Sequence, residues 1–251
     1  MPALSLRARP RRFAHDPAEP ADPAAPADPC ASIGGVPGST GPKTITATFA
    51  HMLIVERDQA LMKARSAARS VARAGVIAAV YAALTVLVLQ IPGGFGFGLI
   101  QFRLSEALTV LAVLTPAAIP GLLIGSVIAN SFMVTVLGPL GLLDVVFGSL
   151  GTLLGATWSW KFRRRTGIAL LGPVFANALI VPAYLPFELK GLGLYKIPML
   201  GINLEGNFLA AYLFGFVAIA IGQMVVVYGL GLPLLRALRR LKVESLLRDD
   251  V

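Results

Sequence analysis

Polar side chains interrupt the most apolar stretches of this sequence at a small number of positions. They are Arg103, Glu106, Asn130, Asp144, Asn177, Tyr184 and Gln223. An ionisable group at the centre of a membrane-spanning helix costs about 2.5–3.5 kcal/mol, so such a group persists where it pairs with another or faces a cavity. We therefore expect these side chains to bind a solute. Asn177 and Gln223 should lie deeper in the membrane than the others, which we expect to converge on one outward-facing pocket.

The residue types that are missing argue against other kinds of chemistry. Both histidines, His15 and His51, and the single cysteine, Cys30, precede the first apolar run. Histidine-based catalysis and Cys/His metal sites are therefore unavailable in the apolar part. The sequence also contains no G-x-x-x-x-G-K-[ST] motif, so it has no P-loop for ATP. We predict no catalytic residue, no metal site and no cofactor, and we expect neither an enzyme nor a self-powered pump.

Simpler interpretations of the same residues stay open. Arg103 and Glu106 are three positions apart and would pair with each other on a helix. Asp144 would cap the helix that carries it. Asn177 would form a hydrogen bond between two helices, which is commonly worth about 0.6 kcal/mol. Spacing alone does not separate these structural roles from a shared pocket.

The elements that carry these residues are expected to be membrane-spanning helices. Of the 251 residues, 56% are apolar and 14% are charged, whereas a soluble domain has about 25% charged residues. A span needs about 20 mostly apolar residues. The run 104–136 is too long for one span, and Pro116 and Pro120 divide it. We predict an all-α polytopic membrane protein with six transmembrane helices, at about 72–90, 103–114, 116–136, 140–162, 166–187 and 206–235.

Basic residues set the expected orientation of these helices. The net charge is +9, and the clusters KFRRR (161–165) and RALRRLK (236–242) flank apolar runs. The positive-inside rule places such clusters in the cytoplasm, and both fall there only if the short segment 103–114 crosses the membrane. We therefore expect a multi-pass protein of the cell membrane with both termini in the cytoplasm, and no nucleic-acid surface.

By composition the chain divides into three parts. Residues 1–60 contain the repetitive stretch DPAEPADPAAPADP, which has little to bury and predicts a disordered tail. The sequence leaves open whether translation begins at Met1 or instead at Met52 or Met62. Residues 61–242 are expected to form the six-helix membrane domain, and residues 243–251 a short cytoplasmic tail.

The first expected span carries small residues at four-residue intervals in two adjacent rows. One row is Ala74, Ala78 and Ala82, and the other is Gly75, Ala79 and Ala83. Small residues at this spacing let another helix approach closely in lipid. The rows predict a face on which a partner docks, although alanine is common in any span.

Four blocks, taken in order, connect these observations to a known family. They are QFRLSEALTVLAVLTPAAIPGLLIGSVIAN (101–130), GPLGLLDVVFGSLGTLLGA (138–156), NALIVPAYL (177–185) and VVYGLGLPLLRAL (226–238). Together they resemble the QueT family, predicted queuosine-precursor substrate-binding subunits (S components) of energy-coupling-factor transporters. The resemblance covers about 72–242. It implies a six-helix S component that captures a 7-deazaguanine-type base from outside. Its partners would be a transmembrane coupling (T) subunit and two ATPase subunits that use the ATP.

The resemblance also implies roles for particular residues. The alanine rows of the first span look like the family's docking face, and the glycine-rich segment 91–102 looks like a lid over the ligand. A deazaguanine presents N–H donors that one carboxylate can accept, with Glu106 the first choice and Asp144 the second. Arg103 would donate to the carbonyl oxygen of the base or hold Glu106 in place.

Other side chains would complete such a site. Asn130 and Asn177 both donate and accept, which suits an edge of mixed polarity. Aromatic side chains expected on the outer side would stack on a planar ligand; these are Phe102, Phe147, Tyr184 and Phe187. Gln223 stands where the family pattern suggests a glutamate, so a neutral base could replace a cationic one.

Other functions remain open at this stage. The chain could be an S component for another small vitamin or purine, which the four blocks do not exclude. It could be a membrane scaffold without a ligand, in which Glu106 and Asp144 are structural. An intramembrane enzyme is disfavoured because the apolar part has no histidine or cysteine.

Overall fold

The computed structural model describes residues 42–90, 103–191, 196–197, 202–203 and 207–242. The chain divides into two compact units, Met1–Met52 and Leu53–Val251. The described part of the first unit is only the beginning of helix α1 (Pro42–Leu89), so the fold below is that of the second unit. The predicted lid 91–102 and C-terminal tail 243–251 lie outside the described residues.

The described elements are almost entirely helical. In chain order they are α1, η1 (Leu104–Val113), α2 (Ala118–Leu137), η2 (Gly138–Gly141), η3 (Asp144–Gly148), α3 (Ser149–Lys161), α4 (Thr166–Gly191), α5 (Phe208–Met224), η4 (Val225–Gly231) and α6 (Leu232–Arg240). Two short strands, β1 (Lys196–Ile197) and β2 (Ile202–Asn203), pair antiparallel between α4 and α5. The all-α fold class is therefore confirmed.

The six predicted spans each correspond to a helical part of the structure. Four helices are long and apolar enough to cross a membrane: Phe49–Leu89, Ala118–Gly141, Thr166–Glu188 and Phe208–Arg240. Leu104–Val113 is a shorter apolar helix, and η2, η3 and α3 together occupy the predicted span at 140–162. The six-helix count of the prediction is confirmed.

The boundary of the predicted N-terminal tail requires a correction. α1 begins at Pro42, inside the segment 1–60 for which composition predicts disorder. Residues 42–60 are helical because the Pro/Ala/Asp repetition stops before them and the sequence becomes richer in helix-forming apolar and charged residues. Residues 1–41 lie outside the described part of the chain.

Helices α1 and α2 approach each other closely because both present small residues. A Cβ atom added at Gly121 would lie 2.7 Å from the backbone oxygen of Ala74, and one at Gly125 would lie 2.8 Å from that of Ala78. Glycine at these two positions therefore lets the helix backbones touch. Beside this contact Tyr81 and Leu122 belong to the same buried cluster.

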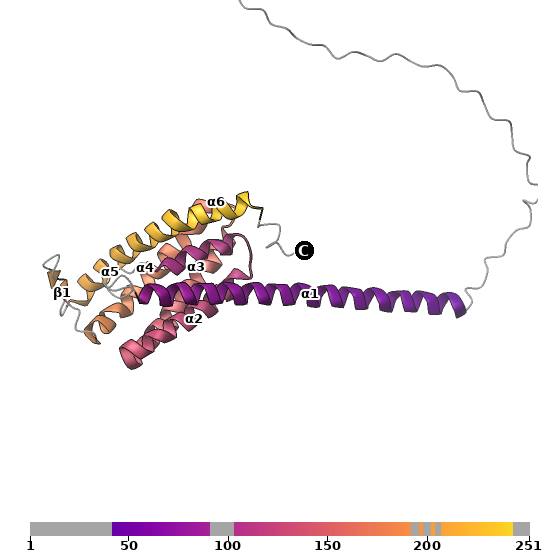
Figure 1. The fold of residues 1–251 in the computed structure, drawn as a ribbon, viewed down its shortest axis with the longest axis horizontal. Helices are drawn as coiled ribbons and strands as arrows, with labels where there is room; N and C mark the ends of the chain where they lie inside the picture. The colour runs from indigo at the N-terminus through magenta and orange to yellow at the C-terminus, as the bar shows by residue number, and fades with distance from the viewer. Residues whose placement is uncertain (1–41, 91–102, 192–195, 198–201, 204–206, 243–251) are drawn as a thin grey trace, which may run out of the picture. The chain divides into compact units, whose positions relative to one another are not determined.

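The short helix η1 lies at the centre of the bundle. It contacts α2, α3, α4, η4 and α6, and most of its side chains are buried. Figure 1 shows α2 on one side of this centre and the continuous run from α5 through η4 to α6 on the other. Arg103 directly precedes η1. Its side chain and the first turn of η1 therefore lie in the middle of the bundle.

Candidate solute-binding site

Glu106 is a fully buried carboxylate in the first turn of η1. The hydroxyl of Tyr81 on α1 donates to its Oε1 atom at 2.6 Å, and the Thr152 hydroxyl on α3 donates to the same atom at 3.2 Å. Its other oxygen, Oε2, is buried without a hydrogen-bond partner among the described residues. Two helices, α1 and α3, thus hold one oxygen of Glu106, and the second oxygen keeps its capacity to accept a hydrogen bond.

Asp144 is a second buried carboxylate, at the start of η3. Its Oδ1 atom accepts a hydrogen bond from Arg103 Nη2 at 3.2 Å and one from the Tyr184 hydroxyl at 2.8 Å. Its Oδ2 atom has no partner within the described ranges. Asp144 lies in a π-helical turn, a distortion that occurs frequently at functional sites. The carboxylate therefore repeats the pattern of Glu106, with one oxygen held and one open.

The structure shows whether Arg103 pairs with its near neighbour Glu106 or with a residue far along the chain. Arg103 forms its ion pair with Asp144, 41 positions away, and not with Glu106. Glu106 is held instead by hydroxyl groups from α1 and α3. The side chain of Arg103 is 13% exposed and that of Asp144 only 1%. Removing one partner of such a buried pair leaves an uncompensated charge, so the pair acts as a unit.

Asn130 on α2 connects the backbone of Asp144 to the hydroxyl groups near Glu106. Its Nδ2 atom lies 2.9 Å from the backbone oxygen of Asp144 and 3.2 Å from the hydroxyls of Ser126 and Ser149. Ser126 lies 3.2 Å from Thr152 Oγ1, the group that donates to Glu106. A continuous hydrogen-bonded chain therefore links Asp144 to Glu106 through α2.

Asn177 and Gln223 are buried amides on α4 and α5. Both polar atoms of the Asn177 side chain and the Oε1 atom of Gln223 lack hydrogen-bond partners in the described part of the structure. Gly151 makes room for Asn177, because a Cβ atom at 151 would lie 2.5 Å from Asn177 Oδ1. A buried amide without partners costs about 1–3 kcal/mol, which favours a role in binding over a role in packing.

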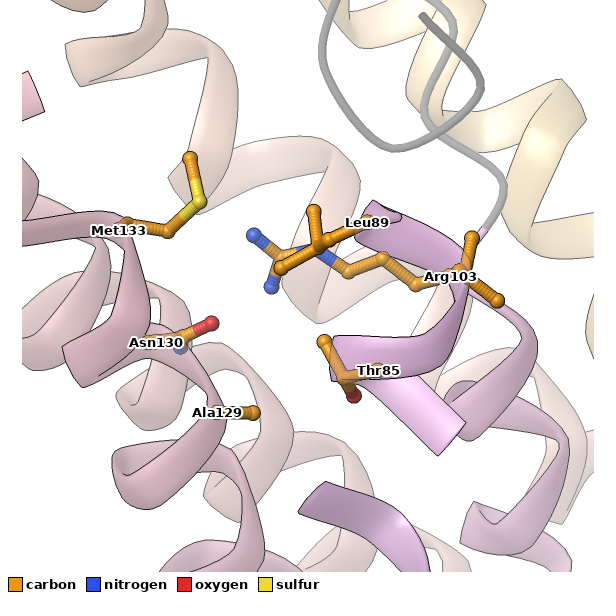
Figure 2. Close-up of a pocket in the computed structure, with 7 residues that line it drawn as sticks. Thr85, Leu89, Arg103, Ala129, Asn130 and Met133 are labelled. Atoms are coloured by element: carbon orange, nitrogen blue, oxygen red, sulfur yellow. The ribbon is translucent and has the colours of Figure 1, made fainter. Parts of the chain in front are cut away.

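Two cavities meet at Arg103. The first is a narrow space between α1, α2 and the start of η1, and it is lined by Thr85, Val88, Leu89, Arg103, Ala129, Asn130 and Met133. Figure 2 shows the Arg103 side chain extending across this space toward Met133 and Asn130. The second is also narrow and is lined by Arg103, Asn177, Val181, Ile219 and Gln223. The guanidinium therefore stands between the two spaces.

The structure brings all seven predicted site residues together. Glu106, Asn130, Asp144 and Tyr184 belong to one hydrogen-bonded network with Arg103. Arg103 then shares a cavity with Asn177 and Gln223. Whether these side chains contact a solute stays a prediction.

Two hydroxyl groups that hold the Glu106 carboxylate are not among the site residues expected from the sequence. Tyr81 is 2% exposed and Thr152 is fully buried, and both donate to Glu106. Each stands in an apolar helix, where an isolated tyrosine or threonine looks like ordinary core. The spacing of Tyr81 after Ile77 indicates that both lie on one helical face, which is buried. A buried tyrosine hydroxyl needs a hydrogen-bond partner, and this requirement could have indicated a role for Tyr81.

The aromatic residues expected to stack on a ligand are distributed differently. Phe147 and Tyr184 are stacked, with ring centroids 6.0 Å apart, but Phe147 and Phe187 are exposed on the outside of the bundle. They line an apolar groove with Tyr184, and neither lines the two cavities at Arg103. Phe102 lies outside the described residues.

The predicted docking face is divided by the structure. Ala74, Ala78 and Ala82 are buried, because this row packs inside the protein, where Gly121 and Gly125 of α2 meet the first two of them. It therefore presents no surface to a partner. Ala79 and Ala83 are exposed, and a Cβ atom at Gly75 would meet nothing within 4 Å. For the second row, docking of a partner stays a prediction.

Helices long and apolar enough to span a membrane, packed around polar groups that are buried without partners in the described ranges, are typical of a membrane protein. No group of His, Cys, Asp and Glu side chains that could hold a metal ion occurs among the residues that the structure describes. The family model described as the QueT transporter matches residues 71–240, so the chain belongs to the QueT transporter family and is a membrane transport protein. Searches of curated proteins and of solved structures found no match.

Proposed function

We propose that this protein is the substrate-binding (S) subunit of an energy-coupling-factor importer that captures a queuosine precursor, a 7-deazaguanine-type base, from outside the cell. One observation carries the proposal. Four buried polar side chains each keep at least one hydrogen-bonding atom without a partner in the described structure: Glu106, Asp144, Asn177 and Gln223. All four belong to the network and cavities around Arg103. In native proteins such groups are rare and require an explanation.

The unpartnered atoms suit the edge of a deazaguanine. Oε2 of Glu106 and Oδ2 of Asp144 can each accept an N–H group. The Asn177 amide can both donate and accept, and Arg103 can donate to a carbonyl oxygen. A site built from such groups rejects ligands that lack the matching atoms, because the buried groups would stay unpaired.

The site must open before a base can enter. The cavity beside Asn177 and Gln223 has room for about one water molecule, and a purine-sized base is several times larger. Arg103 borders both cavities, so a shift of its side chain would join them into one space. We expect the ligand to displace this guanidinium from its position across the first cavity.

The energy for uptake would come from partner subunits. The sequence has no P-loop motif, so we assign ATP hydrolysis to two ATPase subunits that act through a transmembrane coupling (T) subunit. The exposed row of Gly75, Ala79 and Ala83 on α1 is the surface that we assign to the coupling subunit, since small residues permit close helix contact in lipid. The proposed orientation keeps both termini in the cytoplasm.

Calorimetric titration of the purified protein, solubilised without partners, tests the proposal. The ligands are guanine, 7-cyano- and 7-aminomethyl-7-deazaguanine, queuine and unrelated vitamins. We expect saturable binding of a deazaguanine, weakened about 30-fold or more in Glu106→Gln, because the amide has an NH₂ donor in place of one of the two accepting oxygens. Glu56→Gln, an exposed carboxylate on α1, is the matched control and should bind normally.

The other outcomes redirect the conclusion. Binding of a vitamin instead of a deazaguanine would keep the S-component architecture and discard the substrate. Deazaguanine binding that Glu106→Gln leaves unchanged would make Glu106 structural. A folded sample that binds no member of the panel would support the membrane scaffold.

A further inference from the structure

A third buried carboxylate, Glu188, lies beside the site. It is 3% exposed, and its Oε1 atom has no hydrogen-bond partner in the described ranges. Glu188 interacts electrostatically with Asp144 and with Arg103. Glu188 lies near the C-terminal end of α4 and is not among the site residues expected from the sequence.

The spacing along α4 places Glu188 on the same face as the proposed site. Asn177, Val181, Tyr184 and Glu188 follow at intervals of four, three and four residues, which is one face of a helix. All four are buried, at 2%, 3%, 5% and 3% exposure. Tyr184, one turn before Glu188, donates its hydroxyl to Asp144. The face therefore runs from the cavity lined by Asn177 and Gln223, past the Arg103–Asp144 pair, to Glu188.

The charges around this face do not balance. The described site contains the carboxyl groups of Glu106, Asp144 and Glu188, and one guanidinium, that of Arg103. Arg103 is already paired with Asp144 at 3.2 Å. A buried carboxylate is costly unless it is paired, so Glu188 is favoured in its charged form only when a further cation lies beside it.

We propose that Glu188 and the open oxygen of Asp144 form a subsite for a positively charged substituent, so that the ligand of this protein carries an amine. The inference rests on the proposed function, since it assumes that a base occupies the site formed by Glu106 and Asn177. An ammonium group has three N–H donors and no acceptor, which matches Oε1 of Glu188 and Oδ2 of Asp144.

Two bases that differ in one substituent test this subsite. The 7-aminomethyl compound carries a cation and the 7-cyano compound is neutral, while the ring edge that faces Glu106 is the same. We expect the wild type to bind the aminomethyl base about 30-fold or more tightly than the cyano base, the size expected for a buried charge pair. Glu188→Gln should abolish this preference and leave binding of the cyano base unchanged, and Glu56→Gln should leave both affinities unchanged.

Each outcome separates the inference from the proposed function. Equal affinity of the wild type for the two bases, or a preference that survives in Glu188→Gln, overturns the charged subsite and leaves the S-component proposal standing. If neither base binds, the proposed substrate is wrong. The melting temperature of the ligand-free protein then decides whether Glu188 is a structural residue. An unpaired buried carboxylate predicts that Glu188→Gln melts no lower than the wild type, whereas a drop of several degrees would show that Glu188 is a structural partner and overturn the inference.

Discussion

The close contact between α1 and α2 at Gly121 and Gly125, called the seam below, lies in the same bundle as the polar site around Arg103. The two regions differ in how closely their atoms are packed. At the seam, Gly121 and Gly125 meet the backbone of Ala74 and Ala78 so closely that no Cβ atom would fit. At the site, buried carboxylate and amide atoms lack partners in the described structure, and narrow cavities separate the helices. The seam is closely packed, whereas the buried atoms without partners at the site cost stability.

The two regions share α1, which explains how one can support the other. Tyr81 lies next to the seam, where its Cβ atom is 2.9 Å from the Cβ position of Gly125. Its hydroxyl group donates to Glu106. Close packing of α1 on α2 therefore fixes the position of the group that holds the Glu106 carboxylate. A rigid support of this kind is what a precise binding site needs.

The largest expected effect comes from breaking the seam. Gly125→Val would place side-chain atoms against the Ala78 backbone and should lower the free energy of unfolding by about 3 kcal/mol, the upper part of the usual range for overpacking. Thermal unfolding of the detergent-solubilised protein measures the loss. Gly75→Val on α1 is the matched control, since a Cβ atom there meets nothing within 4 Å. If both variants unfold alike, the seam has no special role.

A smaller effect is expected when the site loses one hydroxyl group. Tyr184→Phe removes the donor to Asp144 Oδ1 and should cost about 1 kcal/mol of stability, together with a several-fold loss of ligand affinity. Tyr212→Phe removes a hydroxyl that donates to the backbone oxygen of Leu179 at 3.1 Å and tests the same chemical change away from the site. Calorimetry on both variants should show weaker binding only for Tyr184→Phe; equal losses would contradict a role for Tyr184 in the site.

The smallest effect on the isolated protein is expected on the exposed face of α1. Ala83→Leu should change stability by less than about 0.5 kcal/mol, because it adds a side chain on the surface, and it should leave ligand binding intact. Uptake by the protein together with its coupling and ATPase subunits should nevertheless fall. Ala78→Leu, in the buried row, should instead destabilise the protein alone. Normal uptake by Ala83→Leu would place the docking surface elsewhere.

The sequence by itself determined the helices and the candidate residues. Long apolar runs specify membrane-spanning helices because water is absent from the bilayer core and the backbone must satisfy its own hydrogen bonds. Polar residues such as Glu106 and Asn177 could be found because they are rare and costly in such runs. The four ordered blocks also indicated the QueT family, which the match over residues 71–240 confirmed.

Only the tertiary structure decided which of these residues meet. Arg103 pairs with Asp144 rather than with its near neighbour Glu106, whose partners Tyr81 and Thr152 come from helices 25 and 46 positions away. Which row of small residues on α1 faces α2 is likewise a question of packing. The physical reason is common to all of them: local spacing fixes the face of a helix on which a side chain lies, but the helix that covers this face is chosen by contacts between segments far apart in the chain.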